Sequence, residues 1–355
     1  MLAAPPQVTG RAYVVENGTT GELLAAQDAR ERVPIASITK LMTVLLAVER
    51  TRPSDVVTVS ARAADVGESS ANLRAGERLT VRELLEAALI QSANDAADAL
   101  ADYVGEGSEE HFVALMNQRA RQLGLRDTHY VRPDGLDATG HVSSAHDVTL
   151  LARILMHRPL VRQIVRQQAA TISGGRTLHT WNDLLSSYPG IFGVKTGHTS
   201  AAGWNEVAAA RRGAVTVYAT LLGSPDRGER NEDLAKLLDW GFSRYRSARV
   251  VAKGHVYARA VLGYGREPVA LVAAASLRPS LRVDFPLVRR VVAMNTADLP
   301  VSQGQSLGQV RVYQRGKLVG VVPLVASRSV SRPGLGGRAG WYATRTLDHM
   351  WGWVS

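Results

Sequence analysis

The sequence contains no cysteine among its 355 residues. That absence excludes disulfides, thiolate metal sites and a cysteine nucleophile. No apolar run approaches the roughly 18–20 residues of a membrane-spanning helix, which excludes a polytopic membrane protein. The hydrophobic share of 45% and the charged share of 21% are typical of a globular protein, and the length favours two or three domains.

Acidic residues are scarce in the last third of the chain. Residues 241–355 hold 17 Lys+Arg against 4 Asp+Glu, a net charge of +13, whereas residues 1–240 have a net charge of −3. A basic segment of this kind attracts an anionic membrane surface or an acidic polymer, or is simply a solvated face. The arginines belong to no recognisable nucleic-acid module, so we expect no nucleic-acid partner.

The start of the chain lacks the marks of a secretory signal peptide. Residues 1–6 have neither a basic stretch nor an apolar stretch. This composition fits a cytosolic start, or a mature exported chain from which the signal peptide is absent.

Hydrophobic periodicity places strands at both ends of residues 1–245 and helices between them. A strand–turn–strand pattern covers residues 12–26. Helices are expected at 37–50, 80–91, 95–103, 109–123, 145–156 and 230–244. Strands are expected at 191–195, 203–210 and 214–222. The pattern therefore predicts an α+β domain over residues 1–245.

The remaining residues have a different pattern. Short Val, Leu and Ala runs separated by Gly and Pro fill residues 249–327 and predict a small all-β domain with a hairpin at 314–317. Residues 328–355 then form a Ser/Arg/Gly linker, up to Gly340, and an aromatic tail over 341–355.

The tail has an amphipathic pattern. On a helix, one face collects Ala343, Leu347, Met350, Trp351 and Val354, and the opposite face collects Arg345, Asp348 and His349. Such a helix, with its tryptophans, fits a membrane–water interface. The alternative is that the tail packs on the β domain.

Ser37 and Lys40 form the first candidate catalytic pair. They lie at i and i+3 near the start of an expected helix, so their side chains share one face. The Lys40 amine can then act as a general base toward the Ser37 hydroxyl if burial or a nearby positive charge lowers its pKa. Taken alone, the pattern is also typical of an ordinary helix start.

Ser92 and Asn94 occupy an expected break between two helices. The Ser92 hydroxyl can relay a proton, and the Asn94 amide can hold a substrate carbonyl. Both residue types are also favoured as helix caps, so this motif is weak in isolation.

Lys195, Thr196 and Gly197 end an expected strand and are followed by His198. A strand edge binds an extended peptide, while the lysine supplies a cation for a carboxylate. Gly197 permits close approach of a substrate backbone. A lysine before a turn is the plain alternative.

Together, the three motifs occur in the order typical of class A β-lactamases and penicillin-binding proteins. The segment 33–43 resembles the nucleophile segment of the D-alanyl-D-alanine carboxypeptidases, the low-molecular-mass penicillin-binding proteins. Further similarity to this family lies at 133–145, 195–205 and 237–242. The resemblance covers most of residues 10–245, and for 249–327 it is only architectural.

This resemblance implies a β-lactamase/transpeptidase-like fold, in which an antiparallel sheet carries helices on both faces beside an all-helical subregion. It implies that Ser37 attacks the carbonyl between the two terminal D-Ala residues of a peptidoglycan stem peptide, and that Lys40 accepts the proton. Ser92 would pass a proton to the leaving amine. Backbone N–H groups of Ser37 and His198 would hold the oxyanion.

The resemblance also assigns the recognition of the substrate. Lys195 and Thr196 would bind its terminal carboxylate, and Lys195 would help to keep Lys40 neutral. β-Lactams would act as inhibitors, and no cofactor is needed. The substrate implies an extracytoplasmic location, and the family's amphipathic C-terminal anchors imply membrane contact through residues 341–355.

Three alternatives remain at this point. A class A β-lactamase uses a Glu in E-x-x-L-N for deacylation; no such motif occurs, and the corresponding loop offers only Asp134 and Asp137. An endopeptidase that cuts D-Ala cross-links would use the same residues. A non-catalytic penicillin-binding scaffold or sensor is the alternative from another class.

The nine histidines do not form a metal-binding motif. There is no H-E-x-x-H, and His141 and His146 lack a third ligand in the sequence. We therefore expect no metal site. The glycine-rich segment 334–337 is interpreted as linker rather than as a phosphate-binding loop.

Overall fold

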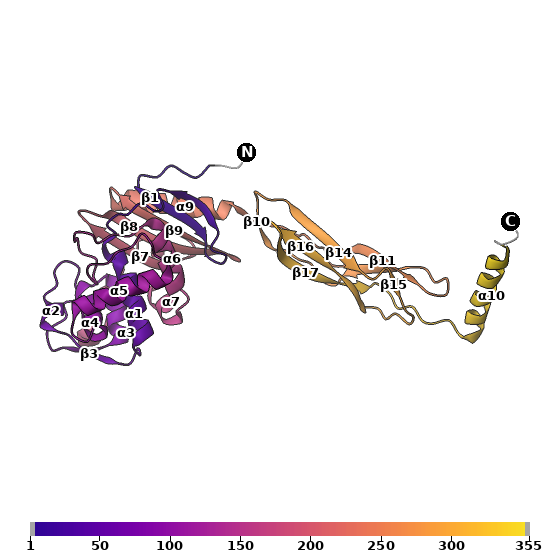
Figure 1. Ribbon diagram of the computed structural model, residues 1–355, viewed down its shortest axis with the longest axis horizontal. Coiled ribbons are helices and arrows are strands. Elements are labelled where there is room, and N and C mark those ends of the chain that lie inside the picture. The colour runs from indigo at the N-terminus through magenta and orange to yellow at the C-terminus, as the bar shows by residue number, and fades with distance from the viewer. Residues whose placement is uncertain (1–3, 352–355) are drawn as a thin grey trace. The chain divides into compact units, whose positions relative to one another are not determined.

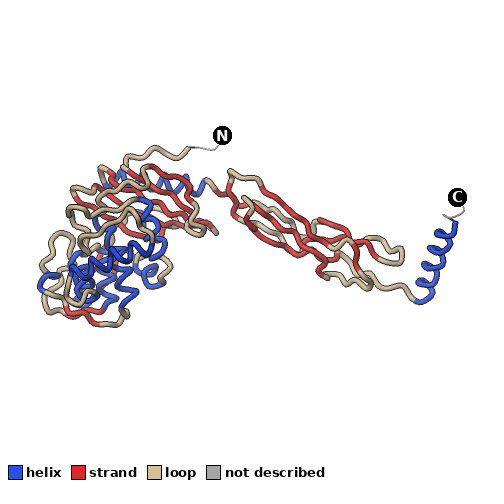
Figure 2. Tube along the Cα trace, in the orientation of Figure 1, coloured by secondary structure: helices blue, strands red, loops and turns tan. Residues whose placement is uncertain are grey.

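The computed structural model describes residues 4–351, and for 344, 345 and 347–351 it describes the backbone alone. The chain divides into two compact units, Met1–Ser243 and Arg244–Ser355. Figures 1 and 2 show a mixed helix-and-sheet unit followed by a unit built mainly of strands.

The first unit is organised around a five-stranded antiparallel sheet with the order β2-β1-β9-β8-β7. Its strands are β1 (Ala12–Asn17), β2 (Leu23–Gln27), β7 (Ile191–Thr199), β8 (Gly203–Arg212) and β9 (Val215–Ser224). The sequence predicts strands at both ends of this unit, and these strands meet at the β1–β9 pair.

Helices cover both faces of this sheet. On one face, Gly241 of α9 (Arg227–Ser243) packs so closely on Val15 and Val217 that a Cβ at this position would clash with both. On the other face, Thr149 of α6 (Ala145–Leu155) meets Thr220, with 2.7 Å between the hydroxyl oxygens. Residues 217 and 220 point to opposite sides of the strand, so the two-faced arrangement expected from the sequence is confirmed.

A cluster of helices lies beside the sheet (Figure 1). It contains α1 (Lys40–Arg50), α3 (Val81–Glu86), the π-helix η2 (Ala87–Gln91), α4 (Asn94–Val104) and α5 (Glu109–Leu123). The resemblance implied an all-helical subregion, but this cluster also contains two strands. A ribbon of two three-residue strands, β3 (Val56–Thr58) and β4 (Arg78–Thr80), pairs within it, and strands so short leave no periodic signal.

The smaller elements of this unit were not predicted as separate elements. They are the helices η1 (Ala36–Thr39), α2 (Ala61–Ala64), α7 (Pro159–Ile164), η3 (Ser173–Gly175) and α8 (Leu184–Ser187), and the paired strands β5 (Ala169–Ile172) and β6 (Arg176–His179). Of these, η1 matters most for the site, because the predicted helix at 37–50 begins with this 3-10 turn.

Strand β7 also differs from its prediction. The sequence placed the strand end at Lys195–Gly197, but the ladder continues to Thr199, because His198 pairs with Trp204 and Thr199 pairs with Gly203. Only then does the chain turn into β8. The third motif therefore lies inside a strand, with a fixed register against β8.

The second unit is a β domain with its own apolar core. Its six-stranded sheet has the order β14-β16-β17-β12-β11-β15, and β10 pairs with β13 separately. The strands are β10 (Tyr245–Ser247), β11 (Val256–Leu262), β12 (Val269–Ala273), β13 (Ser280–Arg282), β14 (Leu287–Ala293), β15 (Thr296–Ala297), β16 (Ser306–Gln314) and β17 (Lys317–Ala326). The predicted hairpin is confirmed: Arg315 and Gly316 both have positive φ, as a tight two-residue turn requires.

The C-terminal helix α10 spans Leu335–Trp351. It begins inside the predicted linker, directly after Pro333 and Gly334, so residues 335–340 are helical rather than extended. The rings of Trp341 and Tyr342 pack against Tyr264 of the β domain, with centroids 5.5 and 6.2 Å away.

The predicted apolar face of the tail rests mainly on side chains outside the described residues, namely Leu347, Met350, Trp351 and Val354. Among the helices of residues 4–351, none combines the length and the apolar character that crossing a bilayer demands.

Candidate active site

The candidate nucleophile, Ser37, lies in η1 immediately before α1. Ala36, the preceding residue, has a φ of +50°, which is unusual for a residue with a side chain. The helix α1 that follows is buried along most of its length, and Lys40 at its first position is completely inaccessible to solvent. The sequence spacing thus places a lysine amine underneath the serine hydroxyl.

The Lys40 amine has three close partners. Its Nζ lies 2.7 Å from Ser37 Oγ, 2.7 Å from Asn94 Oδ1 and 2.6 Å from the Asp134 carbonyl oxygen. The last two partners can only accept hydrogen bonds. A neutral amine with two N–H groups satisfies both of them and leaves its lone pair directed at the serine hydroxyl.

Burial lowers the pKa of Lys40 to about 8. The negative charge of Asp134 works in the opposite direction, and Arg132 offsets part of it. About a fifth of the amine is therefore neutral near physiological pH, whereas an ordinary lysine is almost completely protonated there, and the neutral form is the one that acts as a general base.

Ser92 lies between η2 and α4 in a left-handed conformation, with a φ of 65°. This kink turns its hydroxyl toward β7, where Lys195 Nζ donates a hydrogen bond to Ser92 Oγ at 2.7 Å. Lys195 Nζ also donates to the Thr196 carbonyl oxygen at 2.8 Å. Burial, reinforced by the charge of Lys40, holds the pKa of Lys195 well below its usual range.

The Asn94 side chain is largely committed within the protein. Its Oδ1 accepts from Lys40, and its Nδ2 donates to the Gly67 carbonyl oxygen at 2.8 Å. The contact through Oδ1 makes Asn94 a support for the lysine base. Nδ2 has a second hydrogen and Asn94 lines the pocket, so the contact of this amide with a substrate carbonyl stays a prediction.

Gly197 marks the closest approach of β7 to the nucleophile turn. A Cβ at this position would lie 2.9 Å from the Ile35 carbonyl oxygen and 3.0 Å from the Ser37 and Ile38 nitrogens. These are backbone atoms, so no side-chain movement relieves the clash. Glycine is required because the strand passes directly over the backbone nitrogen of Ser37.

One pocket unites most of these groups. It is lined by Ser37, Glu68, Ser69, Ser92, Asn94, Leu136, Trp181, Thr196, Gly197, His198, Thr199, Trp204 and Arg230. Six of the eight predicted site residues are in this lining. The other two, Lys40 and Lys195, lie buried beneath it, each hydrogen-bonded to a lining serine.

Sequence reasoning missed several pocket residues, and Arg230 is the most important of them. It was assigned only to the start of a helix. Its guanidinium is 1% exposed and lies over the Trp204 ring at 5.8 Å, and that ring stacks on His198 with centroids 4.0 Å apart. No spacing in the sequence connects α9 with β7; only the packing of α9 on the sheet does.

Comparisons with known proteins agree with this geometry. The family model described as D-alanyl-D-alanine carboxypeptidase matches residues 1–226. D-alanyl-D-alanine carboxypeptidase DacD of Salmonella typhimurium is 34% identical over 93% of this chain and 89% of its own. The chain belongs to the D-alanyl-D-alanine carboxypeptidase family. The prediction of a serine peptidase of this family is thereby confirmed.

Solved structures extend the similarity to both units. Penicillin binding protein 6B from Escherichia coli superposes with a TM-score of 0.68 at 30% identity, covering 92% of this chain and 98% of its own. Penicillin binding protein 5 from Haemophilus influenzae gives 0.68 at 27% identity, covering 93% and 100%. The predicted fold class, with its second β domain, is confirmed.

In this member of the carboxypeptidase family, neither loop aspartate is placed to act as a deacylating base. The Asp134 carboxylate is buried and bound by Arg132 through two contacts of 2.6 Å. Asp137 accepts a hydrogen bond from Thr199 Oγ1 at 2.6 Å. Neither lines the pocket, so the geometry gives no support to the β-lactamase alternative.

His141 ties the same loop to the nucleophile turn. Its Nδ1 accepts a hydrogen bond from the Val131 N–H at 3.1 Å, so its Nε2 carries the proton and donates to Thr39 Oγ1 at 2.7 Å. Burial lowers the pKa of His141 to about 4, which keeps the ring neutral. This histidine is a strut rather than a metal ligand.

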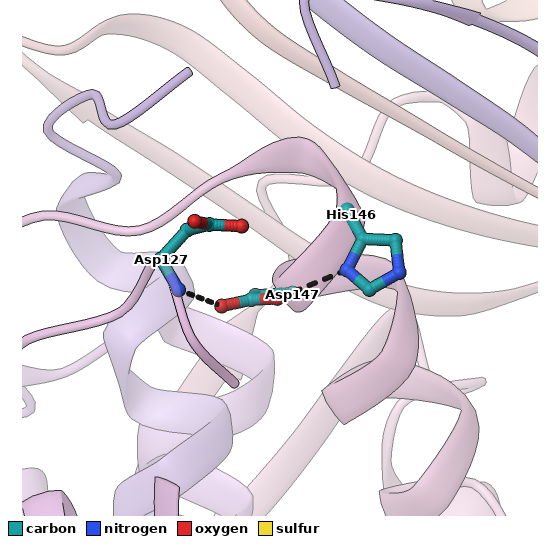
Figure 3. Close-up of side chains that lie close together, drawn as sticks. All are labelled: Asp127, His146 and Asp147. Atoms are coloured by element: carbon teal, nitrogen blue, oxygen red, sulfur yellow. Dashed lines mark hydrogen bonds and ion pairs between the residues drawn. The ribbon is translucent and has the colours of Figure 1, made fainter. Parts of the chain in front are cut away.

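Asp127, His146 and Asp147 lie close together (Figure 3), and none of them lines the pocket. Their contacts are internal: Asp147 accepts from the Asp127 N–H at 2.8 Å and from His146 Nδ1 at 3.0 Å. Arg30 forms an ion pair with Asp127 at 3.0 Å. A guanidinium already occupies the place of a cation, so this cluster serves to hold a loop.

Proposed function

We propose that this chain is a serine D-alanyl-D-alanine carboxypeptidase that removes the terminal D-Ala from peptidoglycan stem pentapeptides. The single observation that carries the proposal is the placement of Lys40: a buried amine 2.7 Å from Ser37 Oγ, with two acceptors that orient its lone pair. An amine so placed activates a serine for acyl transfer.

The chemistry follows from the positions of these groups. Ser37 Oγ attacks the carbonyl carbon of the penultimate D-Ala, and its proton passes to Lys40. The backbone N–H groups of Ser37 and His198 bind the oxyanion, an interaction worth roughly 3–4 kcal/mol. The C–N bond then breaks as Ser92, in contact with Lys195, delivers a proton to the leaving amine. The proton that Lys40 took from Ser37 replaces it on Ser92, so that Lys40 is neutral again.

Hydrolysis completes the cycle. Water attacks the ester carbonyl of the acyl-enzyme as Lys40 takes its proton, and Lys40 then returns this proton to Ser37 Oγ as the ester C–O bond breaks. A β-lactam undergoes the same attack, but its leaving group stays tethered and obstructs the water. We therefore expect β-lactams to inhibit the enzyme as stable esters of Ser37.

The carboxylate of the terminal D-Ala binds Thr196 and Arg230. Both line the pocket, whereas the Lys195 amine lies beneath it and is engaged by Ser92 and the Thr196 carbonyl oxygen. This assignment replaces Lys195 with Arg230 as the cation of the clamp. The hydrogen bond of the Lys195 amine to Ser92 Oγ assigns Lys195 to the support of Ser92. Among the charges that act most strongly on the pKa of Lys40, the positive one is Arg132 and not Lys195.

The proposal is tested by labelling with a fluorescent penicillin and by release of D-Ala from a pentapeptide containing lysine or diaminopimelate. Wild-type protein should label at one site and release D-Ala, and Ser37→Ala should do neither. Label retained by Ser37→Ala would refute the nucleophile assignment.

The same assays separate the alternatives. Labelling without D-Ala release would favour a penicillin-binding scaffold or sensor. Faster cleavage of a cross-linked dimer into two separate stem peptides than removal of D-Ala from a pentapeptide would favour an endopeptidase. Rapid turnover of the penicillin would favour a β-lactamase.

We further propose an extracytoplasmic site of action, where the substrate is found, with peripheral membrane contact through residues 341–355. The aromatic tail and the net charge of +13 over residues 241–355 support attraction to an anionic lipid surface.

A further inference from the structure

Glu206 of β8 is a buried acid that the reaction above does not use. Its side chain is completely inaccessible to solvent. The strand register places it directly opposite Thr196, the residue that lines the pocket on β7. A carboxyl group in the interior of a sheet costs free energy of folding unless it is well paired, so its position calls for an explanation other than stability.

The partner of Glu206 is Arg230. Arg230 Nε lies 3.2 Å from Glu206 Oε2, and the two side chains are 1% and 0% exposed. Neither carboxylate oxygen accepts a hydrogen bond from any residue that the structure describes. The carboxylate therefore depends on this one guanidinium.

The guanidinium of Arg230 is also held by contacts at Nε and Nη2. Arg230 Nη2 donates to Asn231 Oδ1 at 2.6 Å and lies 3.4 Å from Asp183 Oδ2. Nε also donates to Asn231 Oδ1, at 3.1 Å. Within residues 4–351, the hydrogen bonds of Arg230 use Nε and Nη2, so Nη1 is the nitrogen left for a ligand in the pocket.

We propose that Glu206 is a positioning residue that holds the Arg230 guanidinium in the orientation in which it recognises the substrate's terminal carboxylate. The inference rests on the proposed function. Without Glu206 the guanidinium would keep the Asn231 contacts of Nε and Nη2 and the Asp183 contact of Nη2, but it would lose its ion pair with the sheet. Glu206 thereby contributes to the selectivity for a C-terminal carboxylate.

The charge of Glu206 gives this role a pH signature. Burial raises the pKa of Glu206 to about 7, and the negative charge of Asp183 also raises it. The positive charge of Arg230 lowers this pKa, and Lys195 on β7 and Arg227 on α9 lower it more weakly. Above about pH 7 the carboxylate is ionised and holds Arg230. Below that value it is neutral, and the anchor weakens.

The experiment compares two peptides, one ending in D-Ala-D-Ala and one in D-Ala-D-alaninamide. The ratio of their kcat/KM values reports carboxylate recognition and cancels the contributions of Ser37 and Lys40, which are common to both. We expect Glu206→Gln to lower this ratio about tenfold, mainly through KM of the carboxylate peptide, with the amide peptide little changed.

Matched variants define the controls. Glu232→Gln removes an exposed carboxylate from α9 and should leave the ratio unchanged. Glu206→Asp keeps the charge and should recover part of the ratio. In wild-type protein, the ratio itself should fall as the pH drops through about 7, a measurement that requires no variant to fold.

The possible outcomes are distinct. An unchanged ratio in folded Glu206→Gln, or a ratio in wild-type protein that does not change between about pH 6 and pH 8, would overturn the inference. A ratio that rises in Glu206→Gln would also overturn it, because it would mean that the carboxylate merely competes with the substrate for Arg230. If wild-type protein releases no D-Ala at all, the proposed function fails instead.

Discussion

At the scale of single residues, Lys40 illustrates how burial creates a base. Two of its three hydrogen-bond partners, Asn94 Oδ1 and the Asp134 carbonyl oxygen, can accept but not donate hydrogen bonds. The pKa of a lysine in water is far too high for a general base near neutrality, and desolvation removes most of that difference. The catalytic power of the motif therefore depends on a residue's surroundings, which a short motif does not contain.

The first prediction concerns the pH dependence of acylation. Because Lys40 must be neutral to accept the Ser37 proton, the second-order rate of penicillin labelling should rise with pH and level off above about pH 8. Lys40→Arg keeps the positive charge but cannot accept a proton, and should slow labelling about 10²–10⁴-fold.

The matched control is Lys236→Arg, the same change at a half-exposed lysine on α9. It should label at the wild-type rate. A wild-type rate that stays constant from about pH 6 to pH 10 would contradict the role of Lys40 as the base.

At the scale of elements, the loop 131–141 and η1 behave as one assembly. Gly135 has a φ of +88°, and a Cβ there would lie 2.1 Å from the Ala36 carbonyl oxygen, so the loop rests directly on the nucleophile turn. Asp134 contributes its carbonyl oxygen to Lys40, and His141 bonds to Thr39. The sequence similarity around 133–145 therefore reflects support of the nucleophile rather than a second set of reactive groups.

The second prediction tests the His141 strut through stability. Its pKa falls from 6.5 in the unfolded chain to about 4 in the folded one, so the unfolded state binds the proton more readily. The strut's stabilisation is complete above about pH 6.5 and is lost as the pH falls toward about 4, to a total of about 3 kcal/mol.

His141→Gln should remove this part of the pH dependence. We expect the loss of unfolding free energy between about pH 7 and pH 4.5, measured in urea, to be about 2–3 kcal/mol smaller in the variant than in wild-type protein. His179→Gln, at an exposed position, is the control and should follow the wild-type curve. Parallel curves for His141→Gln and wild type would contradict the assignment.

At the scale of the whole molecule, charge and chemistry are divided between the units. The catalytic unit is close to neutral, and the strongly basic part of the chain lies in the second unit and α10. A near-neutral unit has little attraction for an anionic surface, whereas a basic β domain is attracted to one. This division supports a model in which one unit performs the reaction and the other determines where it occurs.

The third prediction concerns that surface. Full-length protein should bind vesicles that contain anionic lipid more tightly than neutral vesicles, and binding should weaken as salt rises from about 0.05 M to about 0.5 M. A chain that ends at Gly334 lacks α10 but keeps Val330, which belongs to the β-domain core. It should lose most of the binding. Equal binding by both chains would contradict a role for the tail.

How far the sequence could predict the molecule depends on the range of the interactions. The hairpin at 12–26, the helix patterns and the β-rich second unit follow from local periodicity, and they are confirmed. The ends of elements were less accurate. The ladder partners of His198 and Thr199 in β8 decide where β7 ends, and the start of α10 inside a glycine-rich stretch has no clear local signal.

The sequence by itself determined the absence of cysteine chemistry, the uneven charge and the three motifs that identify the family, because each of these is encoded in composition or in short spacings. Only the tertiary structure decided what surrounds them: the depth of Lys40, the fit of Gly197 over the Ser37 backbone, and the arrival of Arg230 and Glu206 at the pocket. The physical reason is that desolvation, close backbone approach and ion pairing depend on distances in space, and folding sets these between residues far apart in the chain.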